Sequence, residues 1–289
     1  MEEKVSIIIT TFRRPVDVLK RAIESAINQT YQNKEIIIVN DAPDFVDRDR
    51  IDNLINQYDI IYHVNECSKG AAYSRNIGAK YSTGAYLAYL DDDDEWMLDK
   101  IEKMISVFKP GVGLVYCDML VINGNEEYVQ KLNSYPQNRI LEKLLDRNYI
   151  GGFSGPIISK RVFEEIGRMD ESLLSSQDAD LWRRIAKVSE FIKIDEPLIK
   201  YYISSDSISG NPQKRLQGTI ALLKKFDVDY RKYPKSRRSH INRSVQNYIR
   251  SGWYKAAFTL YKTSYNIYEK LINAYIIPLG VAKKILLRR

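Results

Sequence analysis

Four consecutive aspartates, Asp91 to Asp94, are the residues of this chain whose type and spacing most directly suggest chemistry. Carboxylate oxygens suit hard cations such as Mg²⁺ and Mn²⁺, which also bind the phosphate oxygens of a substrate. A metal held there could stabilise the charge on a departing diphosphate. An isolated aspartate run is more often a solvated acidic turn that caps a helix, which here would begin near Trp96. The surrounding elements decide between these two interpretations.

The acidic run follows a short apolar strand in a series of strands that alternate with helices. The expected strands are 5–10, 35–39, 60–64 and 85–90, and the expected helices lie after Pro15, at 47–57 and at 70–80. Such alternation indicates βαβ units and an α/β fold with a mainly parallel sheet flanked by helices.

Polar residues stand at the ends of these strands, namely Thr10 and Thr11, Asp41, and the run from Asp91 to Asp94. Ligands of parallel sheets bind beyond the carboxyl ends of the strands. We therefore expect these residues to converge on one edge, and this placement favours the metal site over the acidic turn.

Beyond residue 112 the pattern is mixed. Strands are expected at 113–117 and 156–159, with helices at 141–145 and from Ser176 through Leu181, Ile185 and Val188. From about Gln213 the chain is expected to be a helical C-terminal extension, rich in Tyr, Lys and Arg.

Composition sets the class of protein and its compartment. The 289 residues are 44% hydrophobic and 28% charged, the balance of a folded protein. Two cysteines are too few for a disulfide framework, and two histidines argue against a Cys/His zinc site. The N-terminus lacks signal-peptide features, and no apolar stretch approaches the roughly 20 residues that span a bilayer. A cytoplasmic protein is expected.

The positive charge is concentrated after Lys214, within a net charge of +7. An apolar stripe at 271–286 lies near Lys283, Lys284 and the two terminal arginines. This segment is either an interfacial helix on the anionic inner face of the cell membrane or a tail helix packed on the α/β domain. Both interpretations stay open.

Five segments in series resemble the family 2 glycosyltransferases of the GT-A fold, over roughly residues 4–205. They are VSIIITTFRRP, SAINQTY, EIIIVNDAP, KGAAYSRNIGAKYSTGAYLAYLDDDDEW and FEEIGRMDESLLSSQDADLWRRI. The resemblance implies transfer of a sugar from a nucleoside diphosphate to an acceptor hydroxyl, with inversion at the anomeric carbon. It places a GT-A catalytic domain at 1–212, with its nucleotide-binding half at about 1–110 and its acceptor half at about 111–212. A basic helical region at 213–289 completes the chain.

The resemblance assigns the donor side of the reaction. Its Asp-x-Asp motif falls on Asp91-Asp92-Asp93, with Asp93 holding the divalent cation, Mn²⁺ or Mg²⁺. The fourth aspartate leaves the register open, because Asp92 or Asp94 could share in coordination. The implied nucleotide-sugar-binding residues are Thr10, Phe12, Arg14, Asp41, Arg75, Asp91 and Asp92.

Three of these residues have specific implied contacts. Asp41 would accept a hydrogen bond from a ring N–H of the base. Phe12 would stack on that base, at a position where the family often has tyrosine. Arg75 would lie near the diphosphate, whose geometry suits a guanidinium.

The resemblance also assigns the acceptor side. Asp178 is the implied general base, although Gln177 replaces the glutamate that usually precedes it. Leu181-Trp182-Arg183-Arg184 does not reproduce the Gln-x-x-Arg-Trp motif of processive synthases, so a single addition is expected. The polar segment 204–212 is expected to be a loop that folds over the bound donor.

The expected donor is a UDP-sugar, the commonest in the family, and the expected acceptor is a glycan or a lipid-linked glycan of cell-surface polysaccharide or glycoconjugate synthesis. One alternative is a basic nucleic-acid-binding protein, given the sequence pI of about 9.1. That class leaves the acidic run unexplained, so no nucleic-acid partner is expected. A catalytically inactive nucleotide-sugar-binding module is a further alternative, and retention of Asp93 and Asp178 argues against it.

Overall fold

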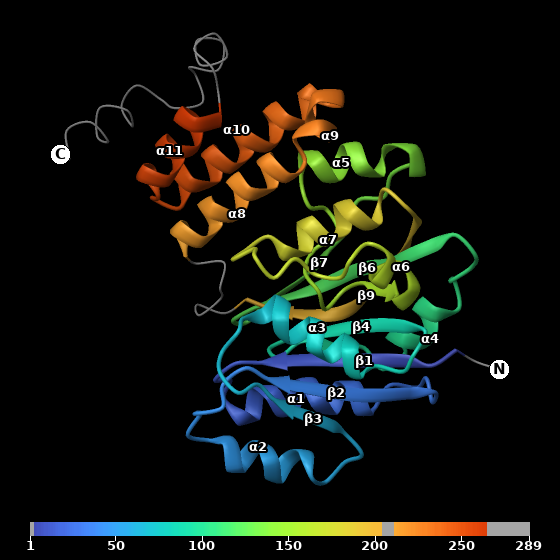
Figure 1. Cartoon of the computed structure of the whole chain (residues 1–289). Helices are drawn as coiled ribbons and strands as arrows, with labels where there is room; N and C mark the ends of the chain where they lie inside the picture. The colour runs from blue at the N-terminus through green and yellow to red at the C-terminus, as the bar shows by residue number, and fades with distance from the viewer. Residues whose placement is uncertain (1–2, 204–210, 265–289) are drawn as a thin grey trace. The chain divides into compact units, whose positions relative to one another are not determined.

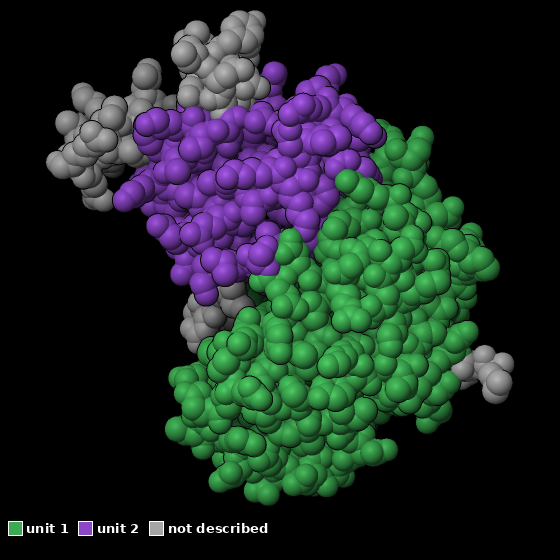
Figure 2. All heavy atoms as spheres, viewed as in Figure 1, with its two compact units in different colours: residues 1–140, 149–171, 181–204 green, residues 141–148, 172–180, 205–289 purple. Residues whose placement is uncertain are grey.

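The computed structural model describes residues 3–203 and 211–264. The chain divides into two compact units, coloured green and purple in Figure 2. Unit 1 comprises residues 1–140, 149–171 and 181–204, and unit 2 comprises residues 141–148, 172–180 and 205–289. The loop expected at 204–212 falls mostly outside the described residues, and the apolar stripe at 271–286 falls wholly outside them.

The first half of unit 1 is the predicted series of βαβ elements. Four parallel strands lie in the order β3-β2-β1-β4, namely β1 (Val5–Thr11), β2 (Lys34–Asn40), β3 (Ile61–Val64) and β4 (Tyr86–Asp91). Figure 1 shows these strands beside the connecting helices α1 (Val16–Ile27), α2 (Arg48–Ile55) and α3 (Ala71–Tyr81). Ile7, Ile8 and Ile9 are all fully buried, because helices cover both faces of β1.

The sheet continues beyond β4 in the order β8-β6-β9-β5, and β7 pairs with β6. These strands are β5 (Glu95–Trp96), β6 (Val112–Asn123), β7 (Glu126–Gln130), β8 (Ile157–Ser159) and β9 (Glu190–Tyr202). β8 is antiparallel to both β4 and β6, so β6 and its parallel neighbour β9 run in the direction of β1 to β4. The predicted α/β fold with a mainly parallel sheet is therefore confirmed.

Two expectations about individual elements are wrong, and one long strand was not predicted. Glu95 and Trp96 form an edge strand, and the next helix, α4 (Lys100–Ile105), begins four residues after Trp96. The helix after Ser176, α7 (Gln177–Ile185), ends before Val188. The strand β9 was not predicted, because Pro197 weakens a strand pattern. Pro197 is accommodated at an irregularity, where β6 residue Asp118 pairs with Pro197 directly after Cys117 pairs with Ile194.

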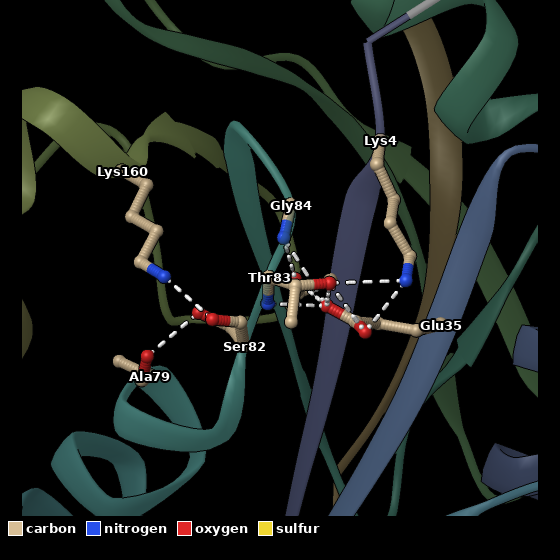
Figure 3. Close-up of polar contacts among 8 residues, drawn as sticks. Lys4, Glu35, Ala79, Ser82, Thr83, Gly84 and Lys160 are labelled. Atoms are coloured by element: carbon tan, nitrogen blue, oxygen red, sulfur yellow. Dashed lines mark hydrogen bonds and ion pairs between the residues drawn. The ribbon is translucent and has the colours of Figure 1, made fainter.

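The amino ends of the strands are fastened together by Glu35 of β2 (Figure 3). Its carboxylate accepts hydrogen bonds from Ser6 Oγ at 2.5 Å and from the Thr83 backbone N–H at 2.6 Å, and it forms an ion pair with Lys4 at 2.8 Å. Burial alone would raise the pKa of Glu35, but these contacts lower it to about 2. At Gly84, a Cβ atom would lie 2.6 Å from the Lys4 carbonyl oxygen, so the close approach requires glycine.

The helix α6 (Lys160–Glu165) also contacts this end of the sheet. It begins at Lys160, whose Nζ donates to the Ser82 carbonyl oxygen at 2.6 Å, as Figure 3 shows. These contacts hold the strand ends that lie away from the polar residues, and they leave the carboxyl ends for a ligand.

Unit 2 is mainly helical in its described part. Its helical segments are α5 (Ile140–Asp146, of which 141–146 lie in this unit), the first four residues of α7 (177–180), α8 (Pro212–Lys225), α9 (Asp227–Lys232), α10 (Pro234–Arg250) and α11 (Tyr254–Ser264). One apolar cluster includes Leu145, Leu222 and Phe226, and another includes Ile241, Val245 and Leu260. The predicted helical C-terminal extension is thus confirmed over residues 212–264. Among the described helices, none combines the length and the apolar character needed to span a bilayer.

Candidate active site

The polar strand ends of unit 1 meet at one edge of the sheet, as predicted. Thr10 of β1 stands directly beside Asp91 of β4 in the strand register. The backbone N–H of Asp41, just after β2, donates to the Thr11 carbonyl oxygen at 2.9 Å. The three segments that carry the candidate donor-binding residues therefore form one contiguous edge.

The four aspartates of the acidic run alternate in their exposure. The side chains of Asp91 and Asp93 retain 31% and 24% of their exposure, whereas that of Asp92 retains 9%. Asp94 is buried, and its backbone N–H closes the turn by donating to the Asp91 carbonyl oxygen at 3.1 Å. Asp91 and Asp93 are thus the two carboxylates of the run that a ligand in solution can reach.

Two arginines from other elements neutralise part of this charge. Arg14 donates from Nε to Asp92 at 2.8 Å and from Nη2 to Asp93 at 3.0 Å, while Arg75 of α3 donates to Asp91 at 2.7 Å. Burial still raises the pKa of Asp92 and of Asp93, and the neighbouring carboxylates add to the effect. A cation bound beside these aspartates would favour their charged form.

Both oxygens of Asp94 are used inside the protein. Oδ2 accepts from Ser154 Oγ at 2.5 Å, and Oδ1 accepts from the Tyr202 backbone N–H at 3.2 Å. Burial, followed by the charge of Asp91, raises the pKa of Asp94 well above its ordinary value. Trp96 is buried as well and donates its indole N–H to the Ser154 carbonyl oxygen at 2.8 Å, which is a packing role.

A glycine-rich loop at 151–155 lies against the acidic turn, and sequence reasoning missed it. A Cβ atom on Gly152 would lie 3.9 Å from Asp91 Oδ2, and the Arg75 guanidinium lies 3.9 Å from the Phe153 ring centroid. The run of small residues around Phe153 was the available signal, because such residues permit a close approach of backbone to a ligand. Arg75 therefore has its position set by Asp91 on one side and Phe153 on the other.

A second missed group lies on the other flank of the turn. Arg21 of α1 donates from Nη2 to the Asp93 carbonyl oxygen at 2.6 Å, and its guanidinium lies 3.6 Å from the Tyr202 ring centroid. The Tyr202 hydroxyl donates to Glu95 at 2.9 Å. Arg21 occupies an ordinary polar position of an amphipathic helix, so the sequence carried no signal for this contact.

Asp41 holds the loop before α3. Its carboxylate accepts from the backbone N–H groups of Lys69 and Gly70 and from the side chains of Asn65 and Ser68, at 2.7–2.9 Å. Burial alone would raise the pKa of Asp41, but these four donors lower it. A nucleotide base that donated to Asp41 would have to replace one of the four, since each oxygen already accepts two hydrogen bonds.

Phe12 follows β1 at the same edge. Its side chain is 51% exposed, and the Arg13 guanidinium lies 5.6 Å from its ring centroid. Arg13 has a φ of +51° and pairs with Asp44 at 2.6 Å. This ring is therefore available for stacking.

Asp178 lies in unit 2, in the first turn of α7 and two residues after Ser176, whose φ is +61°. It is half-buried, and its carboxylate accepts a hydrogen bond from the Asn148 side-chain amide at 2.8 Å. Asp180 in the same turn is fully buried and forms an ion pair with Lys225 at 2.7 Å. Asp178 is thus the more accessible of the two carboxylates.

The residues at the sheet edge fit a divalent cation that is shared with a substrate. Mg²⁺ and similar cations are usually held by one or two carboxylates together with substrate phosphates and water. The half-exposed pair Asp91 and Asp93 supplies such carboxylates. Within residues 3–203 and 211–264, there is no group of three or more His, Cys, Asp or Glu side chains that could hold a metal by themselves.

Comparisons with known proteins agree with this architecture. The family model described as "Glycosyl transferase family 2" matches residues 6–167. An uncharacterized glycosyltransferase of Haemophilus influenzae is 32% identical over 78% of this chain and 81% of its own length. The Escherichia coli protein named UDP-Glc:alpha-D-GlcNAc-diphosphoundecaprenol beta-1,3-glucosyltransferase WfgD is 30% identical over 88% of this chain and 95% of its own length.

Solved structures share the fold at low sequence identity. Staphylococcus aureus TarS 1-349 in complex with UDP-GlcNAc aligns with a TM-score of 0.66 at 12% identity, over 90% of this chain and 81% of that chain. GalNAc-T7 with UDP, GalNAc and Mn²⁺ aligns with a TM-score of 0.63 at 17% identity, over 81% of this chain and 51% of that chain. The fold is accordingly the GT-A fold. With the family match covering more than half of its residues, the chain belongs to glycosyl transferase family 2 and is a glycosyltransferase.

Proposed function

We propose that this enzyme transfers a sugar from a UDP-sugar to an acceptor hydroxyl with inversion at the anomeric carbon, in a metal-dependent reaction of cell-surface polysaccharide or glycoconjugate synthesis. The observation that carries the proposal is the alternation of the acidic run at the carboxyl edge of the sheet, where the carboxylates of Asp91 and Asp93 stay partly exposed and that of Asp94 is buried. Asp91 and Asp93 are thus left to bind a ligand, whereas Asp94 stabilises the turn through Ser154 and Tyr202.

UDP is the proposed nucleotide because it recurs among similar proteins. TarS is described in complex with UDP-GlcNAc, and the name of WfgD specifies a UDP-Glc donor. In this chain Phe12 would stack on the base and Asp41 would accept its ring N–H. Thr10, Arg14, Asp91 and Asp92 complete the proposed donor-binding set.

On the leaving-group side, we assign Asp93 to a Mn²⁺ or Mg²⁺ ion, with Asp91 beside it. When bound, the ion supplies positive charge to the diphosphate as it leaves. Arg75, fixed between Asp91 and Phe153, would offer its guanidinium to the diphosphate. Arg14 and Arg21 would hold the acidic turn while the donor binds.

On the acceptor side, we assign Asp178 as the general base that takes the proton of the attacking hydroxyl. Its carboxylate is half-buried, and so more accessible to an acceptor than that of the fully buried Asp180, which supports this role. We place Asp178 in a catalytic domain at 1–212, which a basic helical region at 213–289 follows.

The proposed acceptor is a glycan or a lipid-linked glycan that receives a single sugar. The name of WfgD specifies an acceptor on diphosphoundecaprenol, which supports the lipid-linked class. An acceptor of this kind is presented at a membrane, so we propose that the enzyme works on the cytoplasmic side in peripheral contact with the cell membrane.

The test is a panel of nucleotide-sugars, each incubated with the purified chain and Mn²⁺, Mg²⁺ or EDTA. Release of the nucleoside diphosphate and donor binding by calorimetry are measured. One or a few UDP-sugars should bind and be hydrolysed slowly with either cation, and EDTA should abolish the hydrolysis. Equal hydrolysis with EDTA would contradict the metal-dependent mechanism, and binding of no UDP-sugar would contradict the proposed donor.

A further inference from the structure

The helix α10 of unit 2 has one apolar face and one basic polar face. Its apolar face packs Ile241, Val245 and Tyr248 into the helical core of this unit. On its other side a surface hollow is lined by Pro234, Lys235, Arg238, Ser239, Asn242, Arg243 and Gln246. Spacings of three and four residues put these side chains on one stripe of the helix, which we call the α10 stripe.

The α10 stripe lies in a strongly positive part of the chain. Residues 211–264 contain thirteen Lys and Arg, no Glu and only two Asp. The two acids, Asp227 and Asp229, both belong to α9, and Asp227 is paired with Arg231 at 2.6 Å. Charge on this scale attracts anions and repels cations.

The charged groups of the stripe differ in exposure. Lys235 and Arg238 are exposed, one helical turn apart. Arg243 is half-buried and donates to Asp146 of α5 at 3.1 Å, so its charge is partly balanced. Lys235 and Arg238 are thus the two basic groups of the stripe that are most exposed to a ligand in solution, and Ser239, Asn242 and Gln246 add polar side chains beside them.

This donor set suits phosphate groups. Guanidinium and ammonium groups bind phosphate oxygens through charge-assisted hydrogen bonds, and hydroxyl and amide groups extend such contacts. The described lining residues include no aromatic side chain on which a nucleotide base could stack. A row of headgroup phosphates needs no stacking platform, so the chemistry favours a lipid surface over single-stranded nucleic acid.

The length of the stripe also suits a surface. From Lys235 to Gln246 the helix rises about 17 Å, at about 1.5 Å per residue. A helical face of that length, with Lys235, Arg238 and Gln246 exposed along it, can contact several headgroups of a membrane surface.

We propose that the α10 stripe binds the phosphate headgroups of anionic phospholipids and so holds the enzyme on the membrane surface. The link to a lipid-linked acceptor rests on the proposed function, whereas lipid binding by the stripe does not. The contact is electrostatic in the described residues, so it weakens as salt is added.

The test is co-sedimentation of the full chain with vesicles of phosphatidylcholine alone or mixed with phosphatidylglycerol. The test variant is Lys235→Gln with Arg238→Gln, and the charge-matched control is Lys80→Gln with Lys109→Gln, which removes two exposed lysines of unit 1. A second comparison variant replaces Lys283 and Lys284 by Gln. Circular dichroism checks that each variant is folded, and release of UDP from the donor checks that its active site works.

The wild-type chain should bind only the vesicles that contain phosphatidylglycerol, and added salt should release it. The α10 variant should bind them about tenfold more weakly, since each basic group near an anionic surface contributes severalfold. The Lys80/Lys109 control should bind like the wild type, and UDP release should be equal in all folded variants.

Several results would overturn the proposal. They are unchanged vesicle binding by the α10 variant, equal loss in the Lys80/Lys109 control, or loss in the Lys283/Lys284 variant alone. Tighter binding of single-stranded RNA than of vesicles, lost in the α10 variant, would assign the stripe to nucleic acid instead. Vesicle binding is measured without donor. These outcomes can therefore be interpreted even if the proposed sugar transfer is wrong.

Discussion

At the scale of single residues, the acidic turn shows how identical side chains acquire different tasks. Asp93 keeps its carboxylate at the surface beside Arg14, while Asp94, one residue later, has both oxygens occupied by Ser154 and the Tyr202 backbone. The sequence predicts this run as the centre of the candidate site, because it follows a buried strand. It could not say which aspartates face the ligand, since that depends on partners more than fifty residues away.

Substitutions at these two positions should therefore affect different properties, metal-dependent activity at Asp93 and stability at Asp94. Asp93→Asn should leave the free energy of unfolding nearly unchanged and should abolish the stimulation of donor hydrolysis by Mn²⁺. Asp94→Ala should lower the free energy of unfolding by about 2 kcal/mol, because it leaves buried polar groups of Ser154 and Tyr202 unpaired. Urea unfolding and a Mn²⁺ titration measure the two effects, and a reversed pattern would assign the metal to Asp94.

Lys100 of α4 gives a pH-dependent prediction at the same scale. Its side chain is fully buried, its ammonium lies 4.3 Å from the Trp96 ring centroid, and burial lowers its pKa to about 8. The unfolded chain, with an ordinary lysine pKa near 10.5, therefore binds more protons between pH 8 and 10.5. The contribution of Lys100 to stability should rise with pH across this window.

Lys100→Met should accordingly be more stable than the wild type at pH 7, by about 2 kcal/mol after loss of the contact with Trp96. The difference between the two proteins in urea unfolding should shrink from pH 8 toward pH 10.5. A Lys100→Met protein that is less stable at pH 7 would show that the contact between the Lys100 ammonium and the Trp96 ring outweighs the cost of burying the charge.

At the scale of elements, β1, β2 and β4 were predictable because each is a short apolar run that is mostly buried, whereas the shorter β3 was predicted although its side chains are partly exposed. β9 could not be predicted in this way. Its irregularity at Pro197 is accommodated by Asp118 of β6, which lies about eighty residues earlier in the chain. The hairpin of β6 and β7 was missed for a related reason. All of β7 is exposed, so it has no buried face to impose a period-two apolar pattern.

The fastening of β1, β2 and the α3–β4 connection by Glu35 can be tested through pH. Its folded pKa of about 2 lies below the ordinary value of 4.5, so its contribution is fully present above pH 4.5 and is lost as the pH falls toward 2. Glu35→Gln should lower the free energy of unfolding at pH 7 by about 2 kcal/mol, a value that is reduced because Lys4 is partly exposed.

The matched control for this experiment is Glu24→Gln, whose carboxylate forms a surface pair with Lys20 at 3.6 Å. That change should cost less than about 1 kcal/mol and should show little dependence on pH. If Glu35→Gln and the wild type differ equally at pH 7 and at pH 2.5, the Glu35 contacts do not depend on its charge.

At the scale of the whole molecule, the sequence indicated a basic helical region after the catalytic segments but not how its charges are arranged. Only the packing of Ile241 and Val245 into the core of unit 2 shows which side of α10 faces solvent. The two units are also not continuous segments of the chain, since residues 141–148 and 172–180 belong to the same unit as the C-terminal helices. One of these inserted segments carries Asp178, which local pattern alone would have assigned to a helix cap.

The central claim, that unit 1 binds the donor while Asp178 activates the acceptor, is tested most directly by Asp178→Asn. Donor binding and sugar transfer are measured in parallel with Asp49→Asn, a change in the first turn of α2 that serves as the control. The account predicts that Asp178→Asn binds the UDP-sugar with the wild-type Kd but transfers the sugar at least about a hundredfold more slowly, the usual scale for loss of a general base. Transfer at the wild-type rate, with donor binding intact, would contradict it.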